Sequence, residues 1–335
     1  MDPDLDPGRS CPLHYHYGPE VLDRLPVAEA QTLLVVGGLY GNVDALNAIL
    51  ARYEAECRAA TGPVRLVFNG DAHWFDVDPD AFQAVNLALA EQDAIAGNVE
   101  AELAAASGAG CGCGYPEYVD AATVARSNEI MERLRAVARA VPGSRNQLGN
   151  LPMHAVFSVA GHRIGVIHGD PESLAGWAFA AESLAPPDTA LRTALGCAQA
   201  RQTSPELVRD YLRRANVSVF ASTHTCLPVA QGYRWDGGAG AVINNGSAGM
   251  PNFSGDLRGL ITRIGASPAP DALYGIELDG LHCQALPVAY DHRGWLRRFE
   301  RWWPAGSPAH RSYHPRITRG PVYTASQADR GFVRV

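Results

Sequence analysis

The chain has 335 residues, of which 47% are hydrophobic and 19% charged, and its formal net charge is −7. This composition is sufficient for a sizeable hydrophobic core and allows one large domain or two ordinary ones. No stretch approaches the roughly 18 consecutive apolar residues of a membrane-spanning helix, so we expect no membrane partner. The acidic balance, without a block of Lys and Arg, argues against a nucleic-acid partner.

The N-terminal stretch MDPDLDPGRSCPLHYHYGPE is acidic and rich in proline. It lacks the basic and apolar regions of a signal peptide. The seven cysteines are mostly scattered, and their number is odd. Such a pattern is typical of free thiols in a reducing compartment, so we expect a cytoplasmic protein. Nothing in the sequence indicates the oligomeric state.

The first hundred residues read as strands that alternate with helices. Residues 32–37 form a short, apolar, β-branched run that predicts a buried strand. Asn42 can cap the helix that follows, and residues 64–68 predict a second strand. A helix with Pro79 in its first turn leads to a third strand end at 94–98. This β-α-β-α-β order predicts a parallel sheet with crossover helices.

The middle of the chain begins with an irregular, glycine-rich segment, residues 105–118. It contains Cys111 and Cys113 as C-x-C without a second pair nearby, which is a weak zinc signal, so a lid over the site is the preferred interpretation. A helix is expected around 119–140. The lid segment and residues 177–203 are the expected walls of the substrate pocket.

Later segments predict a hairpin around Gly161, a helix that starts with Ser204 and Pro205, and several short strands. The stretch from Pro304 onward is expected to be irregular and to wrap the surface. No clear linker interrupts the second half, which favours one domain built around two sheets. The expected division is an N-terminal extension, a main domain and an irregular C-terminal tail, at residues 1–30, 31–303 and 304–335.

Four polar residues follow the ends of predicted strands: Asp71, Asn98, His168 and His224. Open α/β sheets keep their sites at the carboxyl ends of their strands, so these side chains are expected to converge. One carboxylate, one amide and two imidazoles form a plausible set of mixed oxygen and nitrogen ligands for a divalent ion. A single histidine at a strand end is more often structural. Four such groups together are harder to dismiss, and their spacing alone leaves a metal site and a structural role equally open.

The motifs GLYGN, GDAHWFD, GNVE, HGD, THTCLP and NNGSAGMP occur in this order between residues 32 and 251. In their order they resemble the calcineurin-like metallophosphoesterases, whose motifs are D-x-H-G-N, G-D-x-x-D, G-N-H-D/E, a lone His-Gly, and G-H-T-H followed by N-x-G-S. The resemblance implies an α/β fold, a four-layer α/β/β/α sandwich with two metals at the sheet edge. One motif would be weak support, but six in the family's order are specific.

The resemblance implies that one of the two metals is held by a bridging Asp, the Asn of G-N-H, the lone His and the first His of G-H-T-H. These positions are all intact here, as Asp71, Asn98, His168 and His224. The nucleophile implied by the family is a metal-bound water.

The other implied metal has lost three of its four ligands. Gly38 and Tyr40 stand where the family has the Asp and His of D-x-H, and Cys226 replaces the last His of G-H-T-H, which leaves only the bridging Asp71. Val99 occupies the position of the family's general acid, so no general acid is assigned.

Three residues could rebuild part of the lost metal site. Cys226 could bind a soft ion as thiolate or be a small buried hydrophobe, with neither favoured. Tyr40 is more readily a hydrogen-bond donor to phosphate than a metal ligand, and His73 more readily a packed loop residue than a ligand. Asn42 and Glu100 are expected beside the site, the first as a helix cap near phosphate and the second as an orienting carboxylate.

Two functions remain open. The first is a metal-dependent hydrolase that acts on a small phosphomonoester or phosphodiester with one divalent ion (Mn, Fe or Zn), a second ion being doubtful. The alternative is an inactive relative that serves as a binding or regulatory module. The intact ligand set favours the hydrolase, because a pure binding module has no need of all four residues.

Overall fold

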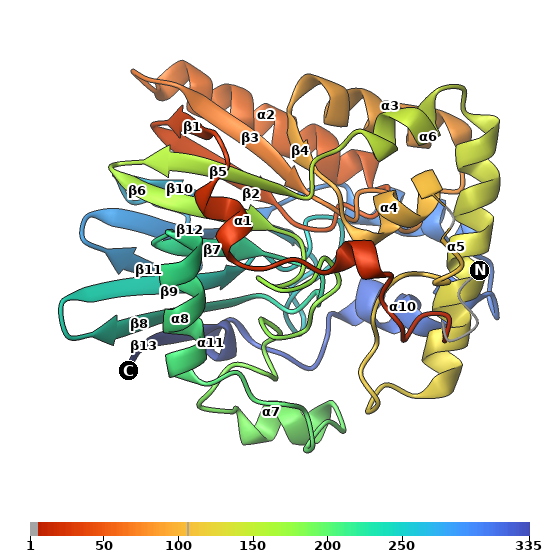
Figure 1. Cartoon of the computed structure of the whole chain (residues 1–335). Coiled ribbons are helices and arrows are strands. Elements are labelled where there is room, and N and C mark those ends of the chain that lie inside the picture. Colours follow the sequence, from red (N-terminus) through yellow and green to blue (C-terminus); the bar gives the residue numbers. More distant parts are fainter. Residues whose placement is uncertain (1–5, 106) are drawn as a thin grey trace.

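Two β-sheets form the centre of the molecule (Figure 1). The computed structural model describes residues 6–105 and 107–335. The first sheet has the strand order β1-β5-β6-β7-β9-β8-β13, and the second has the order β11-β12-β10-β2-β3-β4. The strands are β1 (Val27–Ala30), β2 (Thr32–Val36), β3 (Val64–Asn69), β4 (Asp93–Ile95), β5 (His154–Val159), β6 (His162–Ile167), β7 (Val219–Ser222), β8 (Val229–Trp235), β9 (Gly238–Asn244), β10 (Gly259–Gly265), β11 (Tyr274–Leu278), β12 (Leu281–Val288) and β13 (Asp329–Arg334).

Helices cover the outer faces of both sheets. Helices α2 and α3 lie over the second sheet, and α8 with the short α1 lies over the first (Figure 1). Helix α9 packs into the same core as α2 and the second sheet. The helices are α1 (Glu20–Asp23), α2 (Val43–Ala59), α3 (Pro79–Glu91), α4 (Asn98–Ala105), α5 (Ala121–Ala140), α6 (Ser144–Gly149), α7 (Thr189–Ala194), α8 (Pro205–Ala215), α9 (His292–Trp302), α10 (Pro308–Arg319) and α11 (Ala325–Ala328), with a 3-10 turn at Leu13–Tyr15.

Strand β2 shows why the layers stack in this way. Its residues are all buried, and successive side chains of a strand point to opposite faces. Leu33 and Val35 pack into the core between the two sheets, whereas Leu34 and Val36 pack into the core beneath the helices. The strand is therefore apolar on both faces, and the layers follow as α/β/β/α.

The local predictions for the strands, the hairpin and the start of α8 are confirmed. Strands β2, β3 and β4 pair in parallel and are joined by α2 and α3. Strands β5 and β6 form the expected antiparallel hairpin. Ser204 caps α8 through a hydrogen bond from the Leu207 N–H, with Pro205 in the first turn.

The tail from residue 304 is not irregular, so that prediction is wrong. It contains α10, α11 and β13, and β13 pairs in parallel with β8 at the edge of the first sheet. Pro315 inside α10 masked the helical pattern, because proline removes a backbone donor. Thr324 and Gln327 form a capping box that begins α11.

The N-terminal segment also contributes to the fold. Strand β1 pairs in parallel with β5 at the other edge of the first sheet. Within the described ranges, we find no helix that combines the length and the apolar character needed to cross a membrane.

Candidate metal centre

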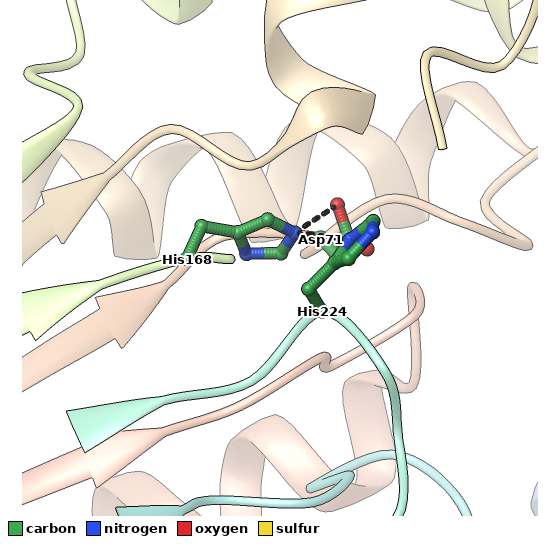
Figure 2. Close-up of side chains that lie close together, drawn as sticks. All are labelled: Asp71, His168 and His224. Carbon is green, nitrogen blue, oxygen red and sulfur yellow. Dashed lines mark hydrogen bonds and ion pairs between the residues drawn. The ribbon is translucent and has the colours of Figure 1, made fainter. Parts of the chain in front are cut away.

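Four strand ends bring the predicted ligands together at one edge of the sandwich. Asp71 follows β3, Asn98 begins α4 just after β4, His168 follows β6 and His224 follows β7. Figure 2 shows Asp71, His168 and His224 pointing toward one another, and one ligand atom from each lies within 4.8 Å of the others. His168 Nε2 lies 3.3 Å from Asp71 Oδ1, 3.3 Å from His224 Nδ1 and 3.1 Å from Asn98 Oδ1.

Backbone carbonyls orient both imidazoles. His168 Nδ1 donates to the carbonyl of Asn69 over 2.8 Å, and His224 Nε2 donates to the carbonyl of Cys113 over 3.0 Å. Because a carbonyl only accepts, each of these nitrogens carries the proton, and the other nitrogen of each ring faces the cluster. Such carbonyl partners are the usual means by which proteins fix the tautomer of a metal-binding histidine.

Hydrogen bonds also orient the two oxygen ligands, Asn98 and Asp71. Asn98 Nδ2 donates to the carbonyl of Cys111 over 2.9 Å, which turns Asn98 Oδ1 toward the histidines. Asp71 Oδ1 accepts from the Val99 N–H over 3.3 Å. The carbonyls of the glycine-rich segment thus hold two of the four ligands, as expected of a segment that covers the site.

The four oriented groups present their lone pairs to one point. Such an arrangement is repulsive unless a proton or a cation lies among them. Burial opposes charge on His168, but the Asp71 carboxylate outweighs burial and raises the pKa of His168. Burial likewise opposes ionisation of Asp71, but His168 outweighs it and lowers the pKa of Asp71. Burial and the charge of His168 lower the pKa of His224 to about 4. The donor set therefore fits a divalent cation with mixed oxygen and nitrogen ligands.

Glu100 supports the loop that carries Asp71. Its carboxylate accepts hydrogen bonds from the backbone N–H groups of Asp71, Ala72 and Gly97, at 2.7 to 2.9 Å. Glu100 is fully buried, and these three donors compensate its charge. It thus holds the loops after β3 and β4 together, which is the orienting position expected from the sequence.

A buried ion pair anchors the glycine-rich segment. Arg135 Nη2 on α5 lies 2.9 Å from Glu102 Oε2 and donates to the carbonyl of Gly110 over 2.9 Å. Tyr15 donates to Glu102 Oε1. The segment that supplies the orienting carbonyls is therefore held from α4 and α5.

Strained backbone is concentrated at this site. Seven described residues other than glycine have positive φ, and four of them line one cavity: Tyr40 (57°), Asp71 (55°), His224 (46°) and Cys226 (66°). Each such residue costs on the order of 1–3 kcal/mol, and such strain persists where the surroundings enforce it, typically at functional sites.

Tyr40 fills the space that a side chain at Gly38 would need. A Cβ atom on Gly38 would lie 2.1 Å from Tyr40 Cζ. The Tyr40 hydroxyl lies 2.9 Å from Cys226 Sγ. Burial raises the pKa of Tyr40 and of Cys226, so both groups are neutral near pH 7 and form a hydrogen-bonded pair.

His73 points away from the cluster. Its ring stacks on Phe82, with ring centroids 4.0 Å apart. Nδ1 lies 3.1 Å from Asp76 Oδ2, and Nε2 lies 3.1 Å from Asn86 Oδ1. Burial lowers the pKa of His73 to about 4 and raises that of Asp76, which favours neutral partners over an ion pair. Both ring nitrogens are engaged, so His73 has no free nitrogen for a metal or phosphate.

Asn42 caps α2, as predicted. Its Oδ1 accepts from the Ala45 N–H over 3.0 Å, and its Nδ2 donates to the carbonyl of Gly249 over 3.0 Å. Asn42 is completely buried, and both ends of its amide are used inside the protein. The residue joins α2 to the loop after β9.

A cavity of about 170 Å³ opens above the metal centre. Asp71, Asn98 and His224 lie in its wall. Five aromatic side chains also line it: Tyr40, Trp74, Tyr115, Trp177 and Tyr313. Tyr115 and Trp177 come from the segments expected to form the pocket walls. Tyr313 was missed, because it comes from α10 in the supposedly irregular tail.

Comparison with known proteins gives structural likeness only. No protein-family model and no curated protein sequence matches the chain. A hypothetical protein from Pyrococcus horikoshii OT3 is 15% identical and aligns over 87% of this chain and 99% of its own, with a TM-score of 0.54. A metallophosphoesterase from Sphaerobacter thermophilus is also 15% identical, over 87% of this chain and 100% of its own, with a TM-score of 0.49. The likeness to the first shows a shared fold, and the expected four-layer α/β/β/α class is confirmed.

Proposed function

We propose that this chain, which has the calcineurin-like metallophosphoesterase fold, is a metal-dependent phosphoesterase with one metal site. The observation that carries the proposal is the convergence of four oriented lone pairs, from Asp71, Asn98, His168 and His224, on one buried point. The outward-facing polar atoms of His168, His224 and Asn98 are already bonded to backbone carbonyls, so the atoms that face this point are placed to hold a cation.

The proposed reaction is hydrolysis of a phosphoester in the cavity beside these residues. A divalent ion there supplies Lewis acidity, which polarises a phosphoryl oxygen and makes water a stronger nucleophile. The P–O bond to the alcohol breaks, water adds hydroxyl to phosphorus, and the alcohol leaves with a proton. Val99 lines the cavity where the family resemblance implies an acid, so no side chain is assigned to protonate the leaving group.

A single ion is favoured over two. Tyr40 and Cys226 stand at two of the positions that the resemblance assigns to the second metal, and they form a neutral pair. Gly38 stands at a third such position and has no side chain to contribute. A protonated phenol and thiol are poor metal ligands, because the anions are the ligating forms. Oxygen and imidazole ligands together suit Mn²⁺, Fe²⁺ or Zn²⁺.

The same observations favour an alternative function. Loss of the second metal and of a general acid would also suit a protein that binds a metal or a phosphorylated ligand without turnover. We place this alternative second, because such a protein has no need for the complete first ligand set.

We also propose a class of ligand and a cellular location for this protein. A small phosphorylated molecule is the proposed ligand, because the cavity is small. A cytoplasmic location is proposed because all seven cysteines are free thiols.

The first experiment is metal analysis of the purified protein, together with hydrolysis of p-nitrophenyl phosphate and bis-p-nitrophenyl phosphate with Mn²⁺, Fe²⁺ or Zn²⁺. We expect about one bound ion per chain and turnover with at least one ion. His168→Ala should abolish both, because it removes the ligand nearest the other three. His162→Ala, at the opposite end of β6, is the matched control and should change neither.

Three results would count against the proposal. Neither metal nor turnover with any ion would contradict it entirely. A bound ion without turnover of either ester would support the binding protein instead. Retention of metal by His168→Ala would show that the ligand assignment is wrong.

A further inference from the structure

The cavity above the metal centre is walled by aromatic rings from distant parts of the chain. Tyr40 follows β2, Trp74 follows β3, Tyr115 belongs to the glycine-rich segment, Trp177 follows β6, and Tyr313 lies on α10. Tyr115, Trp177 and Tyr313 are only partly buried, whereas the other two are almost completely buried. Three rings are thus open to a ligand, and two form the inner wall.

Three of the five rings have their polar tips bonded to protein atoms. The engaged pairs are Tyr40 Oη with Cys226 Sγ at 2.9 Å, Tyr115 Oη with Ser127 Oγ at 2.9 Å, and Trp177 Nε1 with the carbonyl of Cys113 at 3.0 Å. These tips are therefore not available to recognise a ligand by hydrogen bonds. What the rings offer is their π surface, whose face is electron-rich.

The charges around the cavity also favour a positively charged group. Among the described residues that line it, there is no Lys or Arg, so no cationic side chain in its wall repels a positively charged group. The nearby Arg316 does not line the cavity, and its guanidinium donates hydrogen bonds to the carbonyls of Cys226 and Pro251.

The ring arrangement suits a rounded group better than a flat one. Tyr115 and Trp177 lie at 47° to each other with centroids 5.8 Å apart, and Trp74 and Tyr313 lie at 81° with centroids 6.5 Å apart. A flat ring stacks best in a slot between parallel faces, which these pairs do not form. The volume of about 170 Å³ is close to that of a cavity of about 150 Å³ that holds one benzene molecule, so it admits one compact group.

We propose that this aromatic cavity binds a quaternary ammonium group, so that the substrate is a phosphoester of an alcohol that carries such a cation. Quaternary ammonium ions are bound in proteins by several aromatic faces at once. The ester part of this inference rests on the proposed phosphoesterase function. Binding of the ammonium group does not depend on turnover.

The test compares two substrates of the same shape in the Mn²⁺-loaded protein. One is p-nitrophenyl phosphorylcholine, and the other is the p-nitrophenyl neohexyl phosphodiester, in which a tert-butyl group replaces trimethylammonium. We expect kcat/KM to be about tenfold higher for the choline ester, because only its group is attracted to the ring faces by charge. Equal values, or a preference for the neutral ester, would overturn the proposal.

Paired substitutions show whether the rings cause the preference. Tyr313→Leu removes a ring, whereas Tyr313→Phe keeps the ring and loses only the hydroxyl. We expect the leucine variant to lose most of the tenfold ratio and the phenylalanine variant to keep it. Trp235→Leu removes an aromatic side chain outside this cavity and should leave the ratio unchanged. An unchanged ratio in Tyr313→Leu and in Trp177→Leu would refute a role for the rings.

Calorimetry separates this inference from the proposed catalysis. Phosphocholine and neohexyl phosphate are titrated into the same protein, and no turnover is needed. Tighter binding of phosphocholine without hydrolysis of any ester would support the cavity assignment and contradict the hydrolase. Hydrolysis of both esters with equal kcat/KM, together with equal affinity for phosphocholine and neohexyl phosphate, would support the hydrolase and contradict the cavity assignment.

Discussion

Tyr40 and Gly38 show how the packing of two nearby positions depends on one another. The Tyr40 ring stands where any side chain on Gly38 would project, so a ligand at position 38 and the tyrosine cannot coexist. The phenol then bonds to Cys226, which lies 186 residues later in the chain. Gly38, Tyr40 and Cys226 thus form one packed, neutral unit.

This packing predicts strong coupling between the two positions. Gly38→Ala should destabilise the protein by about 1–3 kcal/mol, because the new methyl group overlaps the Tyr40 ring. In a Tyr40→Ala background the same change should cost little, since the ring is gone. Chemical denaturation of the four proteins of the cycle measures the coupling. Gly149→Ala, where the nearest atom lies 3.4 Å from the added Cβ, is the control; additive effects of the two changes would contradict this packing.

Helix α10 is the element whose placement most affects the cavity. It contributes Tyr313 to the wall, and Arg316 on the same helix fastens it to the core. The Arg316 side chain donates to the carbonyl of Pro251 over 3.0 Å and to the carbonyl of Cys226 over 2.9 Å. One arginine thus connects the tail to the two loops that follow β7 and β9.

Removal of this connection should loosen α10 selectively. Arg316→Gln is expected to lower the free energy of unfolding by about 2 kcal/mol, because charged hydrogen bonds to buried carbonyls are lost. Amide hydrogen exchange in α10 should accelerate more than exchange in β2 or β3. Arg311→Gln, at an exposed position of the same helix, should change both quantities little. Equal exchange rates in α10 of the two variants would show that Arg316 does not hold the helix.

At the scale of the whole molecule, stability should depend on the protonation of buried histidines. His154 begins β5, and its ring lies edge-on to Tyr17, with ring centroids 4.2 Å apart. Its Nε2 is buried without a hydrogen-bond partner. Burial lowers the pKa of His154 to about 4. In the folded protein His154 therefore stays neutral down to about pH 4, whereas in the unfolded chain it becomes protonated below pH ~6.5.

The sign of the pH effect follows from linkage. Between pH ~6.5 and 4 the unfolded state binds the proton and the folded state does not, so stability falls as the pH falls. His154→Phe should remove up to about 3 kcal/mol of this acid sensitivity, from the depression of the pKa and ~1.4 kcal/mol per unit. Urea denaturation of both proteins at pH 7 and pH 4.5 measures the difference. Parallel losses of stability in the two proteins would show that His154 does not contribute.

The sequence allowed accurate prediction of features that depend on neighbouring residues. The parallel strands, the caps at Asn42 and Ser204 and the hairpin at Gly161 follow from local periodicity and turn chemistry. The convergence of Asp71, His168 and His224 was also predictable, because strands of known order end at one sheet edge. The tail was misjudged, because its order comes from contacts with β8 rather than from its own composition.

The sequence by itself therefore determined which side chains could meet at one sheet edge and bind a metal. Tertiary structure alone decided how those groups are used. It turned three backbone carbonyls toward the ligands, engaged both nitrogens of His73 elsewhere, and placed Tyr313 in the cavity wall. Such contacts join segments that are distant in the chain, and their geometry arises only when the two sheets pack together.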